Sequence, residues 1–188
     1  MLKKFVAPVV FAAVAFTASV ANAADYVIDT KGAHASINFK IKHLGYSWLT
    51  GRFNKFSGNF SYDSNNVAAA KISVDINPAS VDSNHAERDK HLRNDDFLNV
   101  GDFNSAKFVS TKITDLGNDK LTVVGNLTLL GVTKPVTIDA VKIGEGEDPW
   151  GGYRVGFSGT TTIAMKDYNF KKDFGTIELD LHIEGIRQ

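Results

Sequence analysis

The chain of 188 residues contains no cysteine, and its charges of opposite sign balance. The lack of cysteine excludes a disulfide, a thiol nucleophile and a thiolate metal site. It also excludes anchoring as a bacterial lipoprotein, because that needs a cysteine at the point of cleavage. With 21 basic and 21 acidic residues the formal net charge is zero, so the chain has no general attraction to nucleic acid or to an anionic membrane. We therefore expect no nucleic-acid partner.

Long apolar runs are scarce too, and the longest one lies at the N-terminus. Two lysines precede an apolar run over residues 6–20, which is shorter than the roughly 20 residues that span a bilayer. A small-x-small tripeptide that ends at Ala23 then matches the pattern of a signal peptidase site. We predict a signal peptide over residues 1–23, cleaved between Ala23 and Ala24, with export to the periplasm and no stable membrane insertion. The alternative is an uncleaved membrane anchor.

The remaining residues, 24–188, have the size of one domain, and alternation of apolar and polar residues dominates them. In the first such segment Ile37, Phe39 and Ile41 share one face, while Asn38 and Lys40 lie on the other. Eight segments are predicted as strands, around residues 35–43, 56–62, 70–76, 108–110, 121–129, 136–140, 153–165 and 177–183. Mostly short, turn-rich breaks separate them and favour antiparallel neighbours. The prediction is an all-β protein, either a closed barrel or a sandwich.

One long segment is typical of a helix, and it begins with the sequence NHAERDKHLR. Asn84 is the expected N-cap, with Glu87 completing a capping box, and Asp89 and Arg93 have the spacing of a favourable ion pair. We interpret residues 84–98 as a strap helix that covers one end of the scaffold. The alternative is a lid whose basic side chains contact an anionic head group; these are Arg88, Lys90 and Arg93.

Two features near the second predicted strand bear on function. The aromatic loop Leu44–Gly51 carries Tyr46 and Trp48, which mark a mouth, a dimer contact or a lip that touches a membrane, unless Trp48 folds inward as a plug. His43 faces inward by parity and is expected to be a hydrogen-bonded core residue. Its candidate partners are Asp89 and Ser110.

Motifs of hydrolases, zinc proteases and phosphate loops do not occur in the sequence. His85 and His91 are six residues apart, which places them on helix faces about 120° from each other, so they cannot share one metal ion. The acidic run 144–148 lacks the spacing of a calcium loop. We therefore expect no metal, no cofactor and no catalytic residue. If the protein is an enzyme, the candidate acid and base groups are His43, Asp89 and His91.

Several motifs resemble one known family, and together they extend over nearly the whole chain after residue 23. They are Phe39-x-x-x-His43-x-Gly45, Gly51-x-Phe53-x-x-Phe56-x-Gly58, Arg88-Asp89-x-His91-Leu92 with Asp96-Phe97, Phe108-x-Ser110, and Gly125-x-Leu127-Thr128-x-x-Gly131-Val132-Thr133-x-Pro135-Val136. These motifs resemble the YceI-like family of lipocalin-like, polyisoprenoid-binding periplasmic proteins. One stretch departs from the family, because this chain has Lys166-Asp167-Tyr168-Asn169-Phe170 where many members have an arginine and an Asp-Phe-Gly-like run. The role of that arginine does not carry over.

The resemblance implies an eight-stranded antiparallel lipocalin-like barrel with a long hydrophobic channel. It also implies binding of a long isoprenoid or a similar amphiphile, such as a polyprenyl phosphate or a quinone, and it leaves a homodimer open. The candidate channel-lining residues are Ile37, Phe39, Ile41, Phe56, Phe60, Phe108, Leu127, Leu129, Phe157 and Ile163. The candidate mouth residues are His43, Trp48, Arg88, Asp89 and His91. A solid barrel also needs apolar inward residues, so the pattern alone allows a hollow core and a packed one.

Three functions agree with the sequence. The first is a periplasmic carrier or store for a long isoprenoid lipid. The second is a stress-response or structural protein of the cell envelope without bound lipid. The third is an enzyme that acts on a bound lipid.

Overall fold

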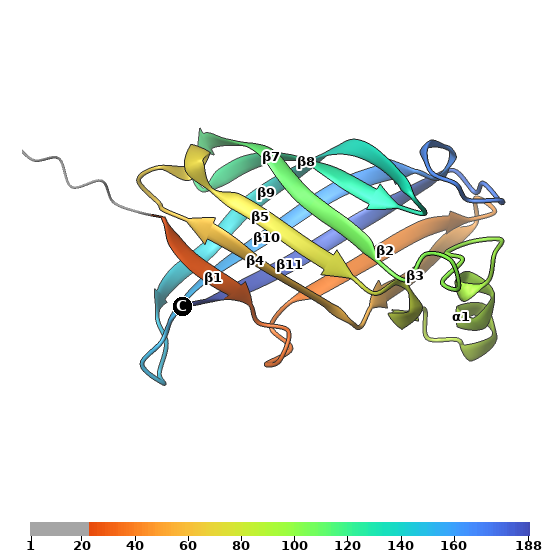
Figure 1. The fold of residues 1–188 in the computed structure, drawn as a ribbon, viewed down its shortest axis with the longest axis horizontal. Helices are drawn as coiled ribbons and strands as arrows, with labels where there is room; N and C mark the ends of the chain where they lie inside the picture. The colour runs from red at the N-terminus through yellow and green to blue at the C-terminus, as the bar shows by residue number, and fades with distance from the viewer. Residues whose placement is uncertain (1–22) are drawn as a thin grey trace, which may run out of the picture.

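A computed structural model describes residues 23–188 and shows a sheet that curves round into a barrel (Figure 1). All but the last residue of the predicted signal peptide lies outside the described residues. The strands are β1 (Ala24–Ile28), β2 (Ser36–His43), β3 (Ser47–Phe53), β4 (Phe56–Tyr62), β5 (Lys71–Ile76), β6 (Val81–Asp82), β7 (Ala106–Gly117), β8 (Lys120–Leu129), β9 (Val132–Glu147), β10 (Tyr153–Ala164) and β11 (Thr176–Arg187). The helices are α1 (Ala86–Arg93) and three short 3-10 helices, η1 (Val67–Ala69), η2 (Pro78–Ser80) and η3 (Met165–Asp167).

Eleven strands build an eight-stranded barrel because three positions in its wall are each shared by two short strands. The closed circuit runs β1-β4-β5-β7-β8-β9-β10-β11 and returns to β1, with antiparallel neighbours throughout. The long strand β11 pairs with β2 through its first half and with β1 through its last residues. Strands β3 and β4 are separated by two residues, and β5 and β6 flank η2. The predicted all-β, eight-stranded antiparallel barrel is confirmed.

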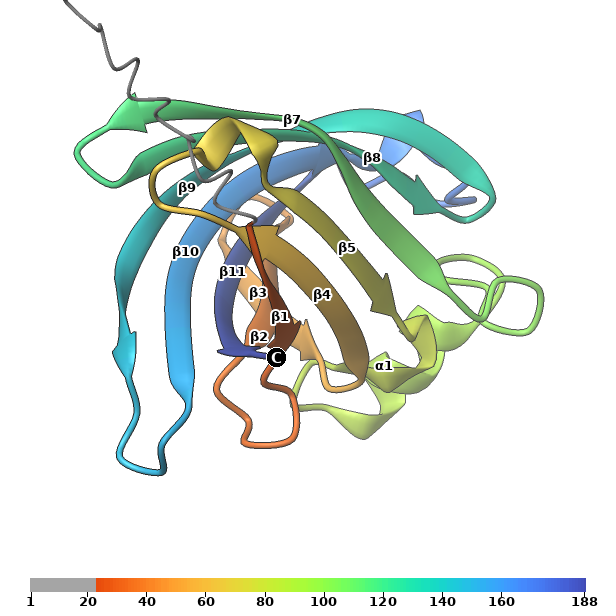
Figure 2. The same cartoon turned by 60° about the vertical axis from the view of Figure 1, so that its left-hand side comes forward.

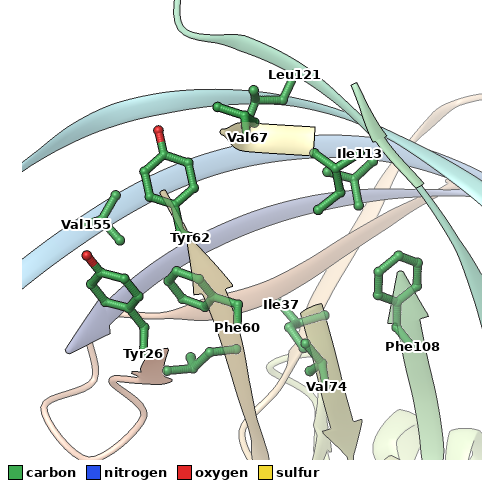
Figure 3. Close-up of a cluster of buried hydrophobic side chains, with 12 residues drawn as sticks. Tyr26, Ile37, Phe60, Tyr62, Val67, Val74, Phe108, Ile113, Leu121 and Val155 are labelled. Carbon is green, nitrogen blue, oxygen red and sulfur yellow. The ribbon is translucent and has the colours of Figure 1, made fainter. Parts of the chain in front are cut away.

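Aromatic rings narrow the barrel at the end that β1 closes. The rings of Tyr26 and Phe60 are stacked with centroids 5.0 Å apart, and Phe157 meets Tyr62 edge-on at 5.2 Å. Figure 3 shows Tyr26 and Phe60 next to each other, with Tyr62 and the fully buried Val155 beside them. Since offset and edge-on arrangements of this kind add to simple area burial, this end of the barrel is well packed.

The strands β1, β3 and β6 were not predicted, and β7 and β9 are longer than predicted. Strand β1 was not predicted, because its five residues offer too short a pattern. Residues 47–51 were expected to belong to the aromatic loop, yet Ser47–Phe53 forms β3 and pairs with β2 along nearly its whole length. Strand β9 runs from Val132 to Glu147 and pairs with β10 up to that residue, so residues 144–147 are extended and not part of a turn. Glycine interrupts the apolar row at Gly51 in β3, and residues 144–147 have no apolar side chain.

Helix α1 lies at the opposite end of the barrel from the C-terminus (Figure 1), follows the end of β5 (Figure 2) and is shorter than predicted. Its N-cap is His85, whose Nδ1 accepts a hydrogen bond from the backbone N–H of Arg88 at 3.2 Å. The prediction of Asn84 as the cap was wrong, because Asn84 has φ of 61° in the left-handed region and precedes the cap. Glu87 is therefore the second helical residue, so there is no capping box.

The expected pair between Asp89 and Arg93 is also wrong. The buried carboxylate of Asp89 accepts hydrogen bonds from the backbone N–H of Ser83 at 2.7 Å and from its hydroxyl at 2.5 Å. Arg93 donates instead to the carbonyl of Val81 at 3.3 Å. Both side chains therefore fix the helix to β6, and neither stabilises it as an isolated element.

Gly125→Ala is expected to destabilise the fold by about 1–3 kcal/mol, the usual cost of overpacking a core. A Cβ atom at this position would lie 2.3 Å from the ring of Phe108 and 2.6 Å from the carbonyl oxygen of Val109. The ladder between β7 and β8 shifts register next to Ser110, the partner of Gly125, as the glycine in a predicted strand indicated. Urea unfolding measures the effect. Gly156→Ala is the control, because its Cβ meets nothing closer than 3.9 Å; an equal loss in both variants would contradict the steric argument.

Candidate functional site

The interior of the barrel is hollow. A cavity of about 600 Å³ lies towards the α1 end and is called here the outer chamber, and one of about 160 Å³, the inner chamber, lies towards the packed aromatic end. Four residues line both chambers, namely Ile37, Ile76, Leu127 and Leu179. The two chambers therefore adjoin and are together called the channel, and the outer one falls within the roughly 300–1,000 Å³ of small-molecule sites.

Nine of the ten predicted lining residues lie along this channel. Ile37, Phe39, Ile41, Leu127, Leu129 and Ile163 line the outer chamber, and Phe60, Phe108 and Phe157 line the inner one together with Ile37 and Leu127. Phe56 lines neither chamber, because it packs against the buried cluster at the wall between β4 and β5. Contact of these side chains with a ligand stays a prediction.

Sequence reasoning missed the aromatic residues that border the outer chamber from outside the regular strands. They are Phe97, Phe170 and Phe174. Phe97 follows α1, and Phe170 and Phe174 lie between η3 and β11. Strand periodicity cannot assign such positions. The departure from the family pattern at 166–170 was the one signal in this region, and Phe170 within it reaches the chamber.

The open end of the outer chamber carries basic side chains. Lys42 and His43 end β2, and Arg88 and His91 stand one turn apart on the same face of α1. Among the described residues that line this chamber, none is an aspartate or a glutamate. The side chains that line this mouth therefore suit an anion, while the walls behind it favour an apolar chain.

Two of the predicted mouth residues have other surroundings than expected. His43 is exposed at the rim and is not a core residue, so that expectation was wrong. Its expected partners are engaged elsewhere, since Asp89 accepts from Ser83 and the hydroxyl of Ser110 accepts from the backbone N–H of Ile72 at 2.9 Å. Asp89 thus supports α1 from behind and does not line either chamber.

Arg88 is held in place at the mouth by the same serine. Its Nε donates to the hydroxyl of Ser83 at 2.8 Å, and its terminal nitrogen donates to the carbonyl of Ser83 at 2.5 Å. A guanidinium with a fixed orientation is a better anion-binding group than a mobile one, because less freedom is lost on binding.

Trp48 is not a plug. It is 45% exposed on the outer face of the β2–β3 hairpin, where the ammonium of Lys40 lies 4.7 Å and that of Lys42 lies 5.7 Å from its ring centroid. Trp48 therefore lies beside the mouth and outside the channel.

The segment that departs from the family pattern folds into η3 and the turn after it. Tyr168 is buried there, and its hydroxyl has no hydrogen-bond partner within the described chain. Burial raises the pKa of Tyr168 to about 12, so the phenol stays neutral at physiological pH. Asn169 ties this segment to the β8–β9 turn by donating to the carbonyl of Leu130 at 3.1 Å.

A cluster of charged residues lies at the packed end, far from the mouth, and sequence reasoning missed it. Arg154 donates to Asp29 at 2.7 Å, to Asp148 at 2.8 Å and to Glu184 at 2.6 Å. His34 shares a further hydrogen bond of 2.9 Å with Asp29. Ligand-type atoms of Asp29, His34 and Glu184 approach within 4.8 Å of one another, but a cation there would have to displace the guanidinium. We call this set of five residues the Arg154 cluster.

A groove of about 1,200 Å³ also crosses the outer face of β9, β10, β11, β2 and β3. Its side chains are mainly polar and of both charges, including Lys40, Thr160, Thr162, Glu178 and Asp180. It is larger than the channel, yet it is open to solvent and lacks a continuous apolar wall. The channel is therefore the better candidate for a site that holds a ligand.

Comparison with known proteins agrees with this architecture. The sequence profile described as the YceI-like domain matches residues 26–185. A UPF0312 protein of Shewanella sp. (strain ANA-3) is 62% identical over 172 residues, which cover 89% of this chain and 90% of that protein.

Two solved structures have a similar fold. The Campylobacter jejuni YceI protein superposes with a TM-score of 0.71 at 30% identity, covering 79% of this chain and 91% of that one. A polyisoprenoid-binding domain from Saccharophagus degradans superposes with a TM-score of 0.62 at 16% identity, covering 88% and 99%. No helix within residues 23–188 is long and apolar enough to cross a membrane. Since the profile extends over most of the sequence and a relative is 62% identical along nearly its whole length, the chain belongs to the YceI-like domain family.

Proposed function

We propose that this protein is a periplasmic carrier or store for a long amphiphile of isoprenoid type with an anionic head. The observation that carries the proposal is the outer chamber, whose walls are apolar and whose ionisable lining residues are all basic. Burial of a tail contributes about 0.8 kcal/mol per CH₂-sized group, less the cost of ordering the chain. The family and the polyisoprenoid-binding domain from Saccharophagus degradans, which has a similar fold, support an isoprenoid tail.

The basic mouth favours a phosphate over a neutral head group of quinone type. Charge-assisted hydrogen bonds from a guanidinium or an ammonium are roughly twice as strong as neutral ones. His43 and His91 line the mouth from opposite elements, β2 and α1, so a head group there would be held from two sides.

Export fits the start of the barrel. Strand β1 begins at Ala24, the first residue after the proposed cleavage point. Cleavage there leaves every residue of β1 in the product, and β1 closes the barrel between β4 and β11.

The test is retention and selectivity of ligand. Protein from an envelope extract should carry an amphiphile that native mass spectrometry detects and solvent extraction releases. Purified protein should bind geranylgeranyl phosphate about tenfold more tightly than geranylgeraniol, since one extra charge-assisted contact contributes about 1.5–3 kcal/mol. Arg88→Gln with His91→Gln should remove most of this preference and keep binding of the alcohol. Lys120→Gln, at the far end of the barrel, is the control. A protein that takes up neither probe would exclude the lipid function and favour an envelope stress-response or structural role.

An enzyme acting on the bound head group is the second candidate. It is favoured by one observation, that His43 and His91 both line the mouth and could act as acid and base. Release of phosphate or of the alcohol from the bound probe, lost in His91→Ala with binding intact, would establish it. Binding of the probe without turnover would leave the carrier function.

A further inference from the structure

The turn that joins β2 to β3 places a leucine where the backbone and the solvent both disfavour one. The backbone N–H of Tyr46 bonds to the carbonyl of His43 at 3.0 Å, and the two central residues, Leu44 and Gly45, have φ of 51° and 81°. Left-handed backbone at both central positions favours Asn-Gly or Asp-Gly, because a side chain with a Cβ is otherwise strained there. Leu44 is nevertheless 69% exposed.

Two other turns of the same chain show what this position usually holds. The β8–β9 turn also uses a leucine and a glycine, Leu130 and Gly131 with φ of 51° and 73°, but Leu130 is 1% exposed and packs in the core. The β7–β8 turn is exposed and has Gly117, Asn118 and Asp119 at its left-handed positions. In the β8–β9 turn, burial of the leucine side chain compensates for the strained backbone. In the β7–β8 turn, residues that tolerate positive φ avoid both the strain and the exposure of an apolar side chain. At Leu44 neither compensation is present among the described residues.

Leu44 belongs to a small apolar surface around the mouth, which we call the mouth rim and define as Leu44, Tyr46 and Phe174. Tyr46 is 88% exposed and Phe174 is 52% exposed, with the ring of Phe174 stacked on Phe97 at 6.0 Å. Leu44 and Phe174 also line the outer chamber. The exposed apolar side chains and the basic mouth thus occupy the same end of the barrel.

We propose that the mouth rim docks on the surface of a lipid bilayer that contains anionic lipids. Apolar side chains enter the boundary between head groups and acyl chains, and adjacent basic groups meet the anionic heads. Lys42 and Arg88 stand directly beside the rim, and the lining of the mouth carries no carboxylate among the described residues. In this orientation the channel opens towards the membrane, and Leu44 gains the burial that its turn lacks.

A second copy of the chain fits the mouth rim less well. A stable protein interface needs about 800 Å² on each partner, whereas a buried aromatic side chain supplies about 150–250 Å². One leucine and two aromatic residues, one of them already half covered, fall short of that area. A bilayer needs no matching surface of this size.

The orientation can be tested with the two tryptophans, which lie at opposite ends of the barrel. Trp48 is on the mouth hairpin and Trp150 is in the β9–β10 turn. Trp150→Phe leaves Trp48 as the fluorescent group, and Trp48→Phe leaves Trp150. With phosphatidylethanolamine vesicles that contain phosphatidylglycerol and a brominated lipid, Trp48 should be quenched and Trp150 should not. Quenching of Trp150 alone, or of both equally, would overturn the proposed orientation.

Affinity is tested by sedimentation with the same vesicles. Leu44→Asn should weaken binding about tenfold, the loss expected when most of a buried leucine side chain is removed, and its unfolding temperature should stay equal or rise because Asn suits the turn. Tyr46→Asn added to it should weaken binding further. Ile143→Asn is the control, because Ile143 is 71% exposed at the far end of the barrel and should leave vesicle binding unchanged.

The remaining outcomes are decisive as well. Vesicle binding that Leu44→Asn leaves unchanged would overturn the proposal, and so would a wild-type protein that ignores vesicles. A wild-type dimer that Leu44→Asn dissociates, without vesicle binding, would assign the rim to a second copy instead. Empty vesicles without isoprenoid are the probe, so failure of this test and failure of the carrier function are separate results.

Discussion

Leu179→Trp is expected to reduce binding of a long-chain ligand about a hundredfold while the barrel stays folded. Leu179 lines both chambers and pairs with Phe39 across β11 and β2. An indole at the junction would close the inner chamber and shorten the outer one. Each CH₂-sized group that can no longer be buried loses about 0.8 kcal/mol, so three or four such groups account for the effect.

The same variant tests whether the barrel is hollow. Enlarging a side chain in a well-packed core lowers the free energy of unfolding by about 1–3 kcal/mol. A tryptophan that enters an empty channel meets no such overlap, so Leu179→Trp should lower it by less than about 1 kcal/mol. Titration with a fluorescent long-chain probe and urea unfolding give the two quantities. A short-chain probe should be affected much less than a long one. Glu178→Trp, the outward neighbour on the same strand, is the control for both. A Leu179→Trp protein with unchanged affinity, or with the full overpacking cost, would contradict a hollow interior.

Arg154→Met is expected to destabilise the fold by on the order of 2 kcal/mol at neutral pH. The reason is Asp29, whose side chain is 4% exposed. Hydrogen bonds from Arg154 and from His34 lower the pKa of Asp29 to about 2, compared with about 3.9 for an unperturbed aspartate. Without the guanidinium, the carboxylate of Asp29 stays buried with too few partners, which is strongly destabilising.

The pH dependence has a definite sign. Because the pKa of Asp29 is lower in the folded protein than in the unfolded chain, the ionised carboxylate stabilises the fold above about pH 4. This contribution is lost as the pH falls from about 4 to about 2. The difference in unfolding free energy between the wild type and Arg154→Met should therefore shrink over that range. Urea unfolding at a series of pH values measures it.

Two further variants make the interpretation specific. Asp29→Asn in the Arg154→Met background should recover part of the stability, because it removes the unpaired buried charge. Arg52→Met is the control for loss of an arginine, since Arg52 approaches Asp82 only to 4.0 Å and both side chains are largely exposed; such surface pairs contribute little. If Arg154→Met and Arg52→Met gave equal losses, or if the loss were independent of pH, the Arg154 cluster would not act as described.

The inward face of the barrel was predictable because it depends on alternation within a few residues. Ile37, Phe39 and Ile41 share a face in any strand with that spacing, whatever lies across from them. The surroundings of Trp48 and His43 were harder to predict, because the alternation assigns a residue to a face of the sheet but not to a position along the barrel. His43 continues the inward row, yet β2 ends there at the mouth, so its side chain is exposed.

The register of the strands and the closure of the barrel could not be predicted from the sequence. Strand β1 has five residues and a weak pattern, but it completes the barrel because β4 and β11 leave an unpaired edge on each side of it. The cap of α1 was missed for a related reason. Asn84 is a good capping residue by type, but the chain that enters from β6 turns through it with positive φ, and His85 takes the position instead.

The sequence by itself determined the all-β class, the helix near residue 86, the family, and which residues of the predicted strands face inward, because all of these follow from local spacing and residue type. Only the tertiary structure decided that the inward rows leave a channel open, that its mouth is basic, and that Arg154 gathers Asp29, Asp148 and Glu184 from distant strands. The physical reason is that an internal volume, and the field at its opening, are sums over side chains brought together by strand order and register. No window of neighbouring residues contains those sums.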